Sequence, residues 1–537
     1  MNFSIIIPVA KKDSRYLKRA LLSLQDQDLE TWEAIVVFDG YKNYDVIKDD
    51  RIKYITIDKA PNASVVRNKG AVYANNEIFF FMDADCILFP GMLKLVADRF
   101  ESEKVDFVYS GYRFNHNTLS VFPSRPFNPY LLESMNYICT MTPMKREVFK
   151  KVGGFREDLD FFQDWDFFLR AVKDHNFKGY YLKDYMFQTE VPNKLSISGN
   201  PKYKFEDKVK RIEEVNNLPK RDIVVTTLSA PHQSVERAKA LNAKYIGMHN
   251  GSALTQVPSQ FFSELDTVIL QGFFPNAVED HIRVFPQKCF KVINWIGTDV
   301  WQMRNKFNWE NIQFIKDNYL SQIDLQLCNS YSLQEELKEI GIDAEVVYQP
   351  LTEKIYVSEK PKKPVISAYC SHGHPLHSEF FITDLAKSMP DIDFVLFGTK
   401  FKDVVRGNIR YMDFVPVQKA IDLSTMHIRI TKHDGFPHTP IQFAMAGRRV
   451  ITNYKMKYCD YVEGIPSENT WEEMKKNLVS YIRKNINVDV SHDVDECRNY
   501  YKDLCCPEKY KNIMLEKINK AKEERDEKEN SNNLRSA

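Results

Sequence analysis

The chain has 537 residues, of which 43% are hydrophobic and 27% are charged, and its formal net charge is +1. This length and composition indicate a globular protein of about two to four domains and exclude a disordered or fibrous chain. The near-zero net charge gives no general attraction to nucleic acid, so nucleic acid is not an expected partner, and at most peripheral membrane contact is expected.

Nine cysteines are scattered through the sequence without the spacing of metal ligands, which indicates free thiols in a reducing compartment. Met1–Pro8 carries no basic segment before its apolar run, so it predicts a first strand and not a signal peptide. No apolar run is long enough to span a bilayer. We therefore expect a cytoplasmic protein.

Strands and helices alternate in the first part of the chain. Apolar runs bounded by polar residues predict strands, and apolar residues at helical spacing predict the helices between them. The expected strands are Ser4–Val9, Ala34–Phe38 and Ile52–Ile57, and the expected helices are Tyr16–Leu24 and Ser64–Ala74. This alternation indicates a parallel, doubly wound α/β sheet.

A further buried strand is predicted at Ile78–Cys86, and it ends in the two carboxylates of Asp83 and Asp85. Because residues i and i+2 of an extended chain point the same way, both side chains are expected at the carboxyl end of the strand, where open α/β sheets bind ligands. Two carboxylates directed at one spot repel each other unless a cation lies between them. Taken alone, the pair is more typical of a solvated turn.

Three more polar residues are expected near this strand end. Asp39 follows the second strand, and Arg67 lies on the early face of the helix before Ile78. A guanidinium suits a diphosphate because its planar fork of donors matches phosphate oxygens. Asp164 lies near the start of a predicted helix, where the dipole stabilises a carboxylate and where capping is an equally good explanation.

The order of these motifs resembles a family 2 glycosyltransferase of the GT-A fold over roughly residues 1–200. A sugar nucleotidyltransferase is disfavoured because the residues after the first strand include no glycine. The resemblance implies inverting transfer from a nucleoside-diphosphate sugar with Mn²⁺ or Mg²⁺. The matching segments are Ser4–Val9, Val37–Gly40, Arg67–Ala71, Met82–Asp85, Gly153–Phe155 and Gln163–Asp166.

The resemblance also implies a role for each matching residue. Asp39 would bind the nucleobase, Arg67 would lie near the diphosphate, and Asp164 would be the general base. Asp83 would contact the ribose or a metal-bound water, and Asp85 would ligate the metal.

Two positions depart from the family's pattern. Gln163 stands where the family usually has a glutamate. No histidine follows the last core strand, where the family often has one that helps to bind the metal. Glu190 remains open as a replacement ligand or as an ordinary surface residue.

Residues 201–220 are rich in Lys, Glu and Asp, which predicts an exposed linker helix between two halves. A new α/β pattern follows, broken by the proline-bounded connector Lys360–Pro364. The expected domains are 1–200, 221–360, 361–490 and a C-terminal part at 491–537. The expected strands of the second half are Asp222–Thr227, Tyr245–Met248, Thr267–Leu270, Lys291–Trp295, Leu325–Cys328, Glu345–Tyr348, Val365–Tyr369, Asp393–Gly398, Ile409–Phe414 and Arg449–Thr452.

The segment Thr431–Gly447 carries a strand–turn–helix signal. Gly435 permits a tight turn, and Thr439-Pro440 supplies a helix N-cap and a first-turn proline. The free amides of such a helix end can bind phosphate, although the same pattern also serves as plain scaffold.

This segment resembles the donor-site motif of GT-B glycosyltransferases of the family 4 type. By that resemblance Asp434 would face the donor sugar's hydroxyls and Gln442 the ribose hydroxyls, with Lys432 and Gly435 beside the donor. Residues 221–490 would then form a GT-B module of two Rossmann-like domains. Glutamine replaces the usual second carboxylate, and the Arg and Lys that the family places after the first strand of its C-terminal half are missing. His372, His374 and His377 follow that strand instead, and a polar loop is favoured there over a metal site.

The last stretch, Lys509–Ala537, predicts a short helix that gives way to a flexible tail. The sequence as a whole predicts a bifunctional glycosyltransferase that builds a glycan on a glycan, lipid-linked or protein acceptor, by inverting transfer in the first half and retaining transfer in the second. The alternative is one active GT-A enzyme whose second half binds a glycan or a partner. Acceptor choice is expected to depend on loops such as Asn115–Asn136.

Overall fold

The structure is a computed structural model of the 537-residue chain, and it forms two compact units, Met1–Arg221 and Asp222–Ala537. The units are described separately. The structure describes every residue except 43–46, 115–116, 123, 191–204, 220–221, 228–230, 248–264, 274–284, 287, 372–375, 377, 400–402, 466, 468 and 537.

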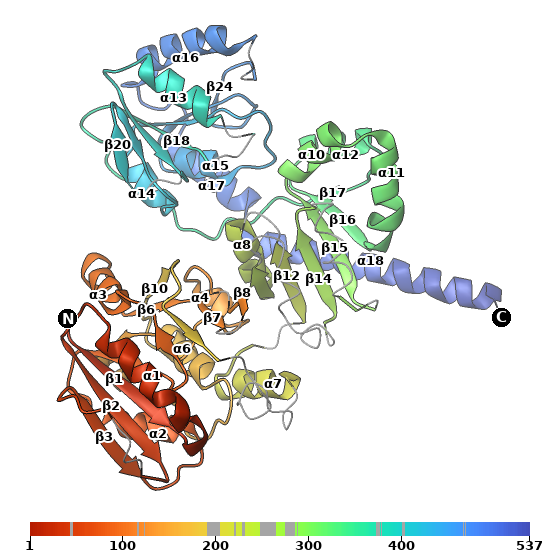
Figure 1. The fold of residues 1–537 in the computed structure, drawn as a ribbon. Helices are drawn as coiled ribbons and strands as arrows, with labels where there is room; N and C mark the ends of the chain where they lie inside the picture. The colour runs from red at the N-terminus through yellow and green to blue at the C-terminus, as the bar shows by residue number, and fades with distance from the viewer. Residues whose placement is uncertain are drawn as a thin grey trace. The chain divides into compact units, whose positions relative to one another are not determined.

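The first unit is built on a seven-stranded sheet in the order β10-β6-β9-β4-β1-β2-β3 (Figure 1). The strands are parallel except β9, which runs antiparallel to both of its neighbours. Their bounds are β1 (Phe3–Val9), β2 (Trp32–Asp39), β3 (Ile52–Ile57), β4 (Ile78–Phe81), β6 (Phe107–Ser110), β9 (Met144–Lys145) and β10 (Gly179–Leu182). The mostly parallel, helix-covered sheet confirms the α/β class predicted for this part of the chain.

A second, four-stranded sheet in the order β5-β11-β7-β8 extends the unit. Its strands are β5 (Ile87–Leu88), β7 (Tyr112–Phe114), β8 (Asn117–Phe122) and β11 (Phe187–Thr189). The stretch 115–136, expected as a loop, therefore contributes β8 and the short helix α4. The helices are η1 (Lys11–Asp13), α1 (Ser14–Gln25), α2 (Ala63–Ala71), α3 (Met92–Ser102), α4 (Pro129–Leu132), α5 (Arg146–Val152), α6 (Gln163–Lys173) and α7 (Phe205–Val215).

Helix α7 occupies the stretch that was expected to be an exposed linker, and one of its faces is buried. Val209 and Ile212 are 7% and 0% exposed. Just after the helix, the Asn216 side chain donates to Oδ1 of Asp166 on α6 over 3.1 Å. Its apolar residues recur at helical spacing among the charges, so the helix packs on the first unit.

The second unit contains two sheets that are mainly parallel. The six-stranded sheet has the order β13-β12-β14-β15-β16-β17 and is parallel throughout. Its strands are β12 (Ile223–Thr227), β13 (Lys244–Gly247), β14 (Thr267–Gln271), β15 (Phe290–Trp295), β16 (Leu325–Cys328) and β17 (Glu345–Val346). The helices in this part are α8 (Pro231–Leu241), α10 (Thr298–Lys306), α11 (Trp309–Asn318), η3 (Leu320–Gln322) and α12 (Tyr331–Glu339).

The seven-stranded sheet has the order β20-β21-β19-β18-β22-β23-β24, and only the pair β20/β21 is antiparallel. Its strands are β18 (Val365–Tyr369), β19 (Asp393–Phe397), β20 (Val404–Arg406), β21 (Ile409–Tyr411), β22 (Met426–Arg429), β23 (Arg449–Thr452) and β24 (Asp460–Tyr461). The following helices are α13 (Glu379–Lys387), α14 (Val417–Asp422), α15 (His438–Met445), α16 (Trp471–Asn485) and α17 (Val494–Leu504). The central strand β22 was not among the predicted strands.

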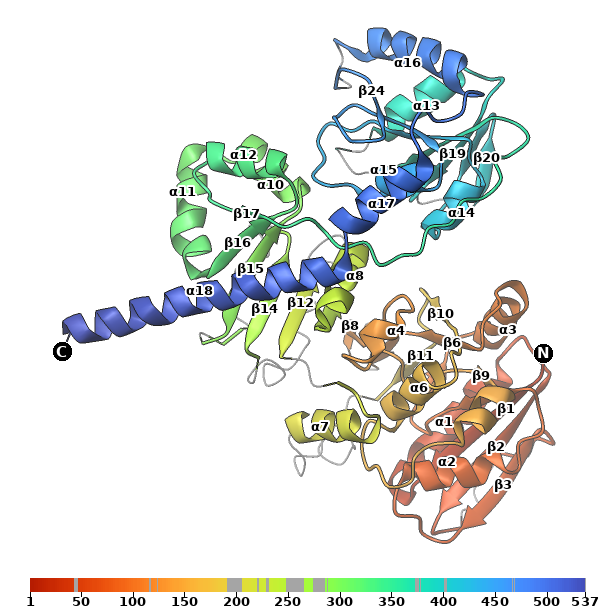
Figure 2. The same cartoon turned by 180° about the vertical axis from the view of Figure 1, so that it is seen from behind.

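The last helix, α18 (Pro507–Ser536), corrects the expectation of a short helix and a flexible tail. After α17 the chain returns to the six-stranded sheet, and α18 runs across its face beside α8 (Figure 2). Tyr510, Met514 and Ile518 are 3%, 0% and 2% exposed, so one stripe of the helix is buried. Lys522 pairs with Asp266, and Arg525 Nη1 lies 3.4 Å from Asp324 Oδ1.

Within the described part of the chain, no helix is both long and apolar enough to cross a membrane. The nine cysteines are all free thiols, as their scattered positions predicted.

Candidate active site

The candidate site of the first unit lies where the parallel strands β1, β2 and β4 end. β4 pairs with β1, and β1 pairs with β2, so their carboxyl ends share one edge of the sheet. Asp39 is the last residue of β2, and Asp83 and Asp85 follow β4 closely. Asn62 is the N-cap of helix α2, and its side chain accepts a hydrogen bond from the backbone N–H of Val65. The helix carries Arg67 to the same edge of the sheet.

Asp83 and Asp85 come together in a turn and not on a strand. β4 ends at Phe81, so the strand alternation on which the prediction relied does not apply. The two carboxylates still interact, because burial, followed by the charges of Asp83 and Asp13, raises the pKa of Asp85 to about 6. The turn therefore concentrates negative charge that lacks full compensation.

Arg67 connects this turn to the helix that carries the proposed base. Its Nη2 donates to Asp83 Oδ1 over 2.8 Å, and its Nη1 donates to Gln163 Oε1 over 3.0 Å. The guanidinium is 6% exposed and lies 5.6 Å from the centre of the Phe155 ring. Arg67, Asp83 and Gln163, which are far apart in the sequence, thus form one hydrogen-bonded network.

Asp164 stands beside this network at the start of α6. Its Oδ1 accepts hydrogen bonds from the backbone N–H of Trp165 over 2.8 Å and from Asn136 Nδ2 over 3.0 Å. Thr140 Oγ1 lies 3.4 Å from Oδ2. Burial raises the pKa of Asp164, and Arg67 and the hydrogen bonds oppose that rise. Asn136 and Thr140 were not identified from the sequence, because nothing in their local pattern links them to Asp164.

Asp39 is 9% exposed and already engaged by neighbours from the segment after β3. The backbone N–H of Ala60 donates to Oδ1 over 2.7 Å, and Lys59 Nζ pairs with Oδ2. The carboxylate thus fixes the loop that borders the edge of the sheet. Lys59 is itself largely exposed and remains accessible to a ligand.

Two further carboxylates lie near Asp85. Asp13 is close enough to Asp83 that their charges interact, and burial raises the pKa of Asp13. Glu190 follows β11, which pairs with β5 so that Gln188 lies opposite Ile87. Continuing that register places Glu190 opposite Asp85, and one guanidinium nitrogen of Arg19 contacts both the Glu190 carboxylate and the Asp85 carbonyl. The register of this short antiparallel pair could not be read from the sequence.

Acidic oxygens of this kind suit Mn²⁺ or Mg²⁺, which prefer hard oxygen ligands. In the described residues no three His, Cys, Asp or Glu side chains come together as a ready-made metal site. Mg²⁺ is commonly held by one or two carboxylates, with waters and substrate phosphates completing its shell. Arg67 pairs with Asp83, and Asp85 adds a second carboxylate to the same turn, so these two side chains fit a cation bound in that way.

The residues singled out in the second unit are engaged in internal contacts. Arg429, at the end of β22, donates from Nε and Nη2 to Asp434 Oδ2 over 2.9 and 2.7 Å. Asp434 Oδ1 accepts from the backbone N–H of Gly435 over 3.1 Å. The Asp434 carboxylate therefore shapes its own loop.

Gln442 is 5% exposed, and its Nε2 donates to Glu353 Oε2 over 2.7 Å. Lys432 is exposed, and its backbone N–H donates to the carbonyl of Leu376. Gly435 lies against the loop after β15, where a Cβ added to it would come within 2.6 Å of the Ile296 carbonyl oxygen. His372, His374 and His377 lie outside the described residues.

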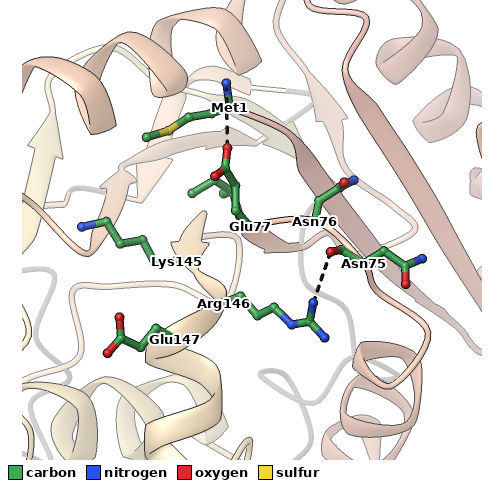
Figure 3. A pocket seen from close by; sticks show the side chains of 8 residues that line it. Met1, Asn75, Asn76, Glu77, Lys145, Arg146 and Glu147 are labelled. Carbon is green, nitrogen blue, oxygen red and sulfur yellow. Dashed lines mark hydrogen bonds and ion pairs between the residues drawn. The ribbon is translucent and has the colours of Figure 1, made fainter.

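A cavity of about 430 Å³ lies at the opposite, amino edge of the first sheet (Figure 3). Arg146 Nη1 donates to the Asn75 carbonyl over 3.1 Å, and the Met1 amino group lies 3.9 Å from Glu77 Oε1. None of the predicted site residues lines it. Its lining residues are Met1, Asn75, Asn76, Glu77, Ile78, Lys145, Arg146 and Glu147.

A mostly parallel sheet that gathers an acidic turn, a buried arginine and a helix-borne carboxylate at the carboxyl ends of its strands has its charged groups where open α/β sheets bind ligands. Residues 4–159 match the family described as Glycosyl transferase family 2. The first unit thus contains a family 2 glycosyltransferase domain, and the protein is a glycosyltransferase.

Named relatives agree with this class. The chain is 27% identical over 256 residues to the uncharacterized glycosyltransferase YwdF of Bacillus subtilis, covering 45% of this chain and 94% of YwdF. It is 24% identical over 182 residues to the UDP-Glc:alpha-D-GlcNAc-diphosphoundecaprenol beta-1,3-glucosyltransferase WfgD of Escherichia coli, covering 32% of this chain and 70% of WfgD. The crystal structure of S. aureus TarS 1-349 in complex with UDP-GlcNAc is 18% identical, with a TM-score of 0.34, and the match covers 54% of this chain and 82% of that one.

Proposed function

We propose that the first unit transfers a sugar from a nucleoside-diphosphate sugar to an acceptor hydroxyl, with inversion at the anomeric carbon. The observation that carries this proposal is the network in which Arg67 bonds Asp83 and Gln163 beside Asp164. It brings a cation for the diphosphate, carboxylates for a metal and a carboxylate for the acceptor to one edge of the sheet.

Asp164 is the proposed general base. A base must lie within hydrogen-bond reach of the acceptor hydroxyl, and its efficiency rises as its pKa approaches the working pH. Burial raises the pKa of Asp164 in this direction. Asn136 and the Trp165 N–H both bond Oδ1, whereas Oδ2 accepts one longer hydrogen bond from Thr140 Oγ1, so we assign the proton transfer to Oδ2.

Donor binding is assigned to Asp39, Arg67, Asp83 and Asp85. Arg67 offers its guanidinium to the diphosphate, and Asp39, at the end of β2, faces the nucleobase. Asp83 and Asp85 would hold Mn²⁺ or Mg²⁺, and Glu190, opposite Asp85 in the extended register, is the proposed third carboxylate. A divalent cation bound there neutralises charge on the departing diphosphate.

For the second unit, the sequence left retaining GT-B transfer and a binding role open. Two mainly parallel sheets are compatible with a GT-B module, but Asp434 is occupied by Arg429 and Gln442 by Glu353. A donor diphosphate also needs cations, and only the exposed Lys432 was assigned to that task. We therefore favour one active GT-A enzyme with a ligand-binding second unit over a bifunctional enzyme.

The names of two relatives support a proposal for the acceptor class. The name of WfgD gives alpha-D-GlcNAc-diphosphoundecaprenol, a lipid-linked sugar diphosphate, as its acceptor. Another relative, RfbC of Myxococcus xanthus, is named as an O-antigen biosynthesis protein. We propose a glycan or lipid-linked acceptor in the cytoplasm, with polysaccharide assembly as the process.

The test is product analysis by mass spectrometry with a panel of nucleotide sugars. Asp164→Asn should abolish transfer at unchanged donor affinity, whereas Asp434→Ala should change no product. Full activity in chelator would refute the metal assignment, and a sugar product that disappears in Asp434→Ala would restore the bifunctional alternative.

A further inference from the structure

A strip of buried polar side chains crosses the six-stranded sheet near the carboxyl ends of its strands. The side chains belong to Thr226 on β12, Gln271 on β14, Asn294 on β15, Asn329 just after β16 and Gln349 after β17, and each is at most 1% exposed. Gln271 and Asn294 face each other in register on neighbouring strands. A parallel sheet covered on both faces normally presents apolar residues there, so this strip is not explained by the fold.

The amides of the strip bond one another in sequence across the strands. Asn294 Nδ2 donates to Gln271 Oε1 over 3.3 Å and to Asn329 Oδ1 over 3.0 Å. Asn329 Nδ2 donates in turn to Gln349 Oε1 over 3.4 Å. These bonds fix the orientation of the side chains and leave other polar atoms of the same residues unused.

Arg237 of α8 places a positive charge on this strip. It is 0% exposed, and its guanidinium donates to Asn329 Oδ1 and, over 3.2 Å, to the Tyr510 hydroxyl. In the described part of the chain no carboxylate pairs with it. A buried charge costs free energy unless an opposite charge and hydrogen bonds compensate it. A bound anion would supply the opposite charge for Arg237.

Several buried atoms around Arg237 have no hydrogen-bond partner. The unused donors are Arg237 Nε, Gln271 Nε2 and Gln349 Nε2, and the unused acceptor is Asn294 Oδ1. Thr226 Oγ1 and His438 Nε2 are also unpaired. Native structures rarely leave buried polar atoms unpaired, and a group of them in one neighbourhood indicates a bound polar species.

His438 adds no second charge to this neighbourhood. It is the first residue of α15, and burial, together with the Arg237 guanidinium, lowers its pKa to about 4. The imidazole is therefore neutral near pH 7. Arg237 is the charge that a ligand must balance, and the surrounding amides offer mainly N–H donors.

We propose that Arg237, Gln271, Gln349 and their neighbours on the strip bind one phosphate group, either as a free anion or as part of a sugar phosphate or nucleotide. A guanidinium and two amide NH₂ groups match the several acceptor oxygens of a phosphate. Because all members are buried, a ligand that reaches them must be small. It uses neither Asp434 nor any residue of the transfer site of the first unit, so it goes beyond the proposed function.

The test is thermal unfolding of the full chain in phosphate against chloride at equal ionic strength. Phosphate should raise the Tm of the wild-type protein in a saturable way. Gln349→Glu should raise the Tm in chloride and remove the phosphate effect, because the new carboxylate lies one hydrogen-bonded residue away from Arg237 and supplies its counter-charge. The exposed Gln322→Glu variant makes the same chemical change elsewhere and should keep the full phosphate effect.

A second variant guards against a folding defect in Gln349→Glu. Gln271→Leu removes an Nε2 that has no partner, and it should raise the half-saturating phosphate concentration at least about fivefold. No phosphate-specific rise in the wild type, or an unchanged rise in both variants, overturns the proposal.

The source of the phosphate is resolved by repeating the titration with inorganic phosphate, glucose 1-phosphate and UDP. Only the part of each Tm rise that Gln349→Glu removes belongs to this site. A UDP effect that survives in Gln349→Glu but is lost in Arg67→Met belongs to the first unit, so failure of this inference and failure of the proposed transferase mechanism remain distinguishable.

Discussion

Among single side chains, Gln163 controls how much positive charge Arg67 offers to a ligand. Gln163 is neutral, so Arg67 shares only the charge of Asp83. Gln163→Glu would add a second carboxylate to the guanidinium, and the donor diphosphate would have to compete with it. We expect the donor KM, measured in steady-state kinetics, to rise about tenfold. This corresponds to a loss of about 1.4 kcal/mol of donor binding free energy.

Gln163→Met is the matched control, because it removes the hydrogen bond to Arg67 without adding charge. It should raise the KM far less than Gln163→Glu. Equal KM values for the two variants would show that the charge on Arg67 does not govern donor binding.

The Asn136 side chain sets the pH range of the proposed base. Its hydrogen bond to Asp164 favours the ionised carboxylate and lowers its pKa, against the larger effect of burial. In Asn136→Ala the pKa of Asp164 should rise further. The base would then be protonated, and transfer lost, at a higher pH than in the wild type. The acid limb of the kcat profile should therefore move to higher pH. An unmoved limb with a lower kcat would mean that Asn136 only supports the fold.

His427 makes the stability of the second unit depend on pH. It is fully buried on β22, bonded to Ser367 Oγ over 3.0 Å, and burial lowers its pKa to about 3. Between pH 6.5 and about 3 the unfolded chain therefore binds more protons than the folded one. The free energy of unfolding decreases as the pH is lowered through this window. We expect a loss of about 2 kcal/mol at pH 5 in denaturant unfolding, absent in His427→Gln.

The sequence identified these residues better than it identified their partners. Asp434, Gln442 and Asp83 stood out by type and position, but their contacts come from Arg429, Glu353 and Arg67. Gln442 and Glu353 are 89 positions apart, and local patterns carry no information about such pairs. β22 was missed for the same reason, because its buried His427 and Arg429 depend on tertiary partners.

Among the elements, several strands with continuous apolar runs were predicted to within one or two residues, but the strand expected to reach Cys86 ends at Phe81, and α18 was the main error. Its average composition is highly polar, which indicated disorder. Tyr510, Met514 and Ile518 nevertheless recur every four residues, the spacing of a single helical stripe, and all three are buried. The stripe was present in the sequence, but its covering role depends on a sheet whose last strand, β17, ends about 160 residues before the helix begins.

Truncation tests this role. Removing residues 507–537 deletes three apolar side chains whose burial is worth about 1.5–3 kcal/mol each, and it exposes the surface that they cover, so the second unit should unfold or aggregate. Removing only 527–537 deletes a mainly polar stretch in which residues 527–531 are exposed, and it should leave the Tm unchanged. Circular dichroism of both truncated chains gives the measurement, and a stable chain without 507–537 would contradict the covering role.

Across the whole molecule, the two units have separate hydrophobic cores. The fragment of residues 1–221 should therefore fold alone and hydrolyse a nucleotide sugar slowly. The fragment of residues 222–537 should fold alone, show no donor hydrolysis and keep the phosphate-dependent Tm rise. A fragment 1–221 that folds without binding any nucleotide would refute the placement of donor binding in the first unit.

The return of α18 to the six-stranded sheet also fixes an order of events during synthesis. A ribosome releases β12 to β17 first, then the whole seven-stranded sheet, and the helix that covers the earlier strands emerges last. The later sheet can complete its core while the earlier one still exposes the surface that Tyr510, Met514 and Ile518 will cover. A nascent chain stalled near its C-terminus is thus most vulnerable in its middle, where chaperones and proteases would find that uncovered face.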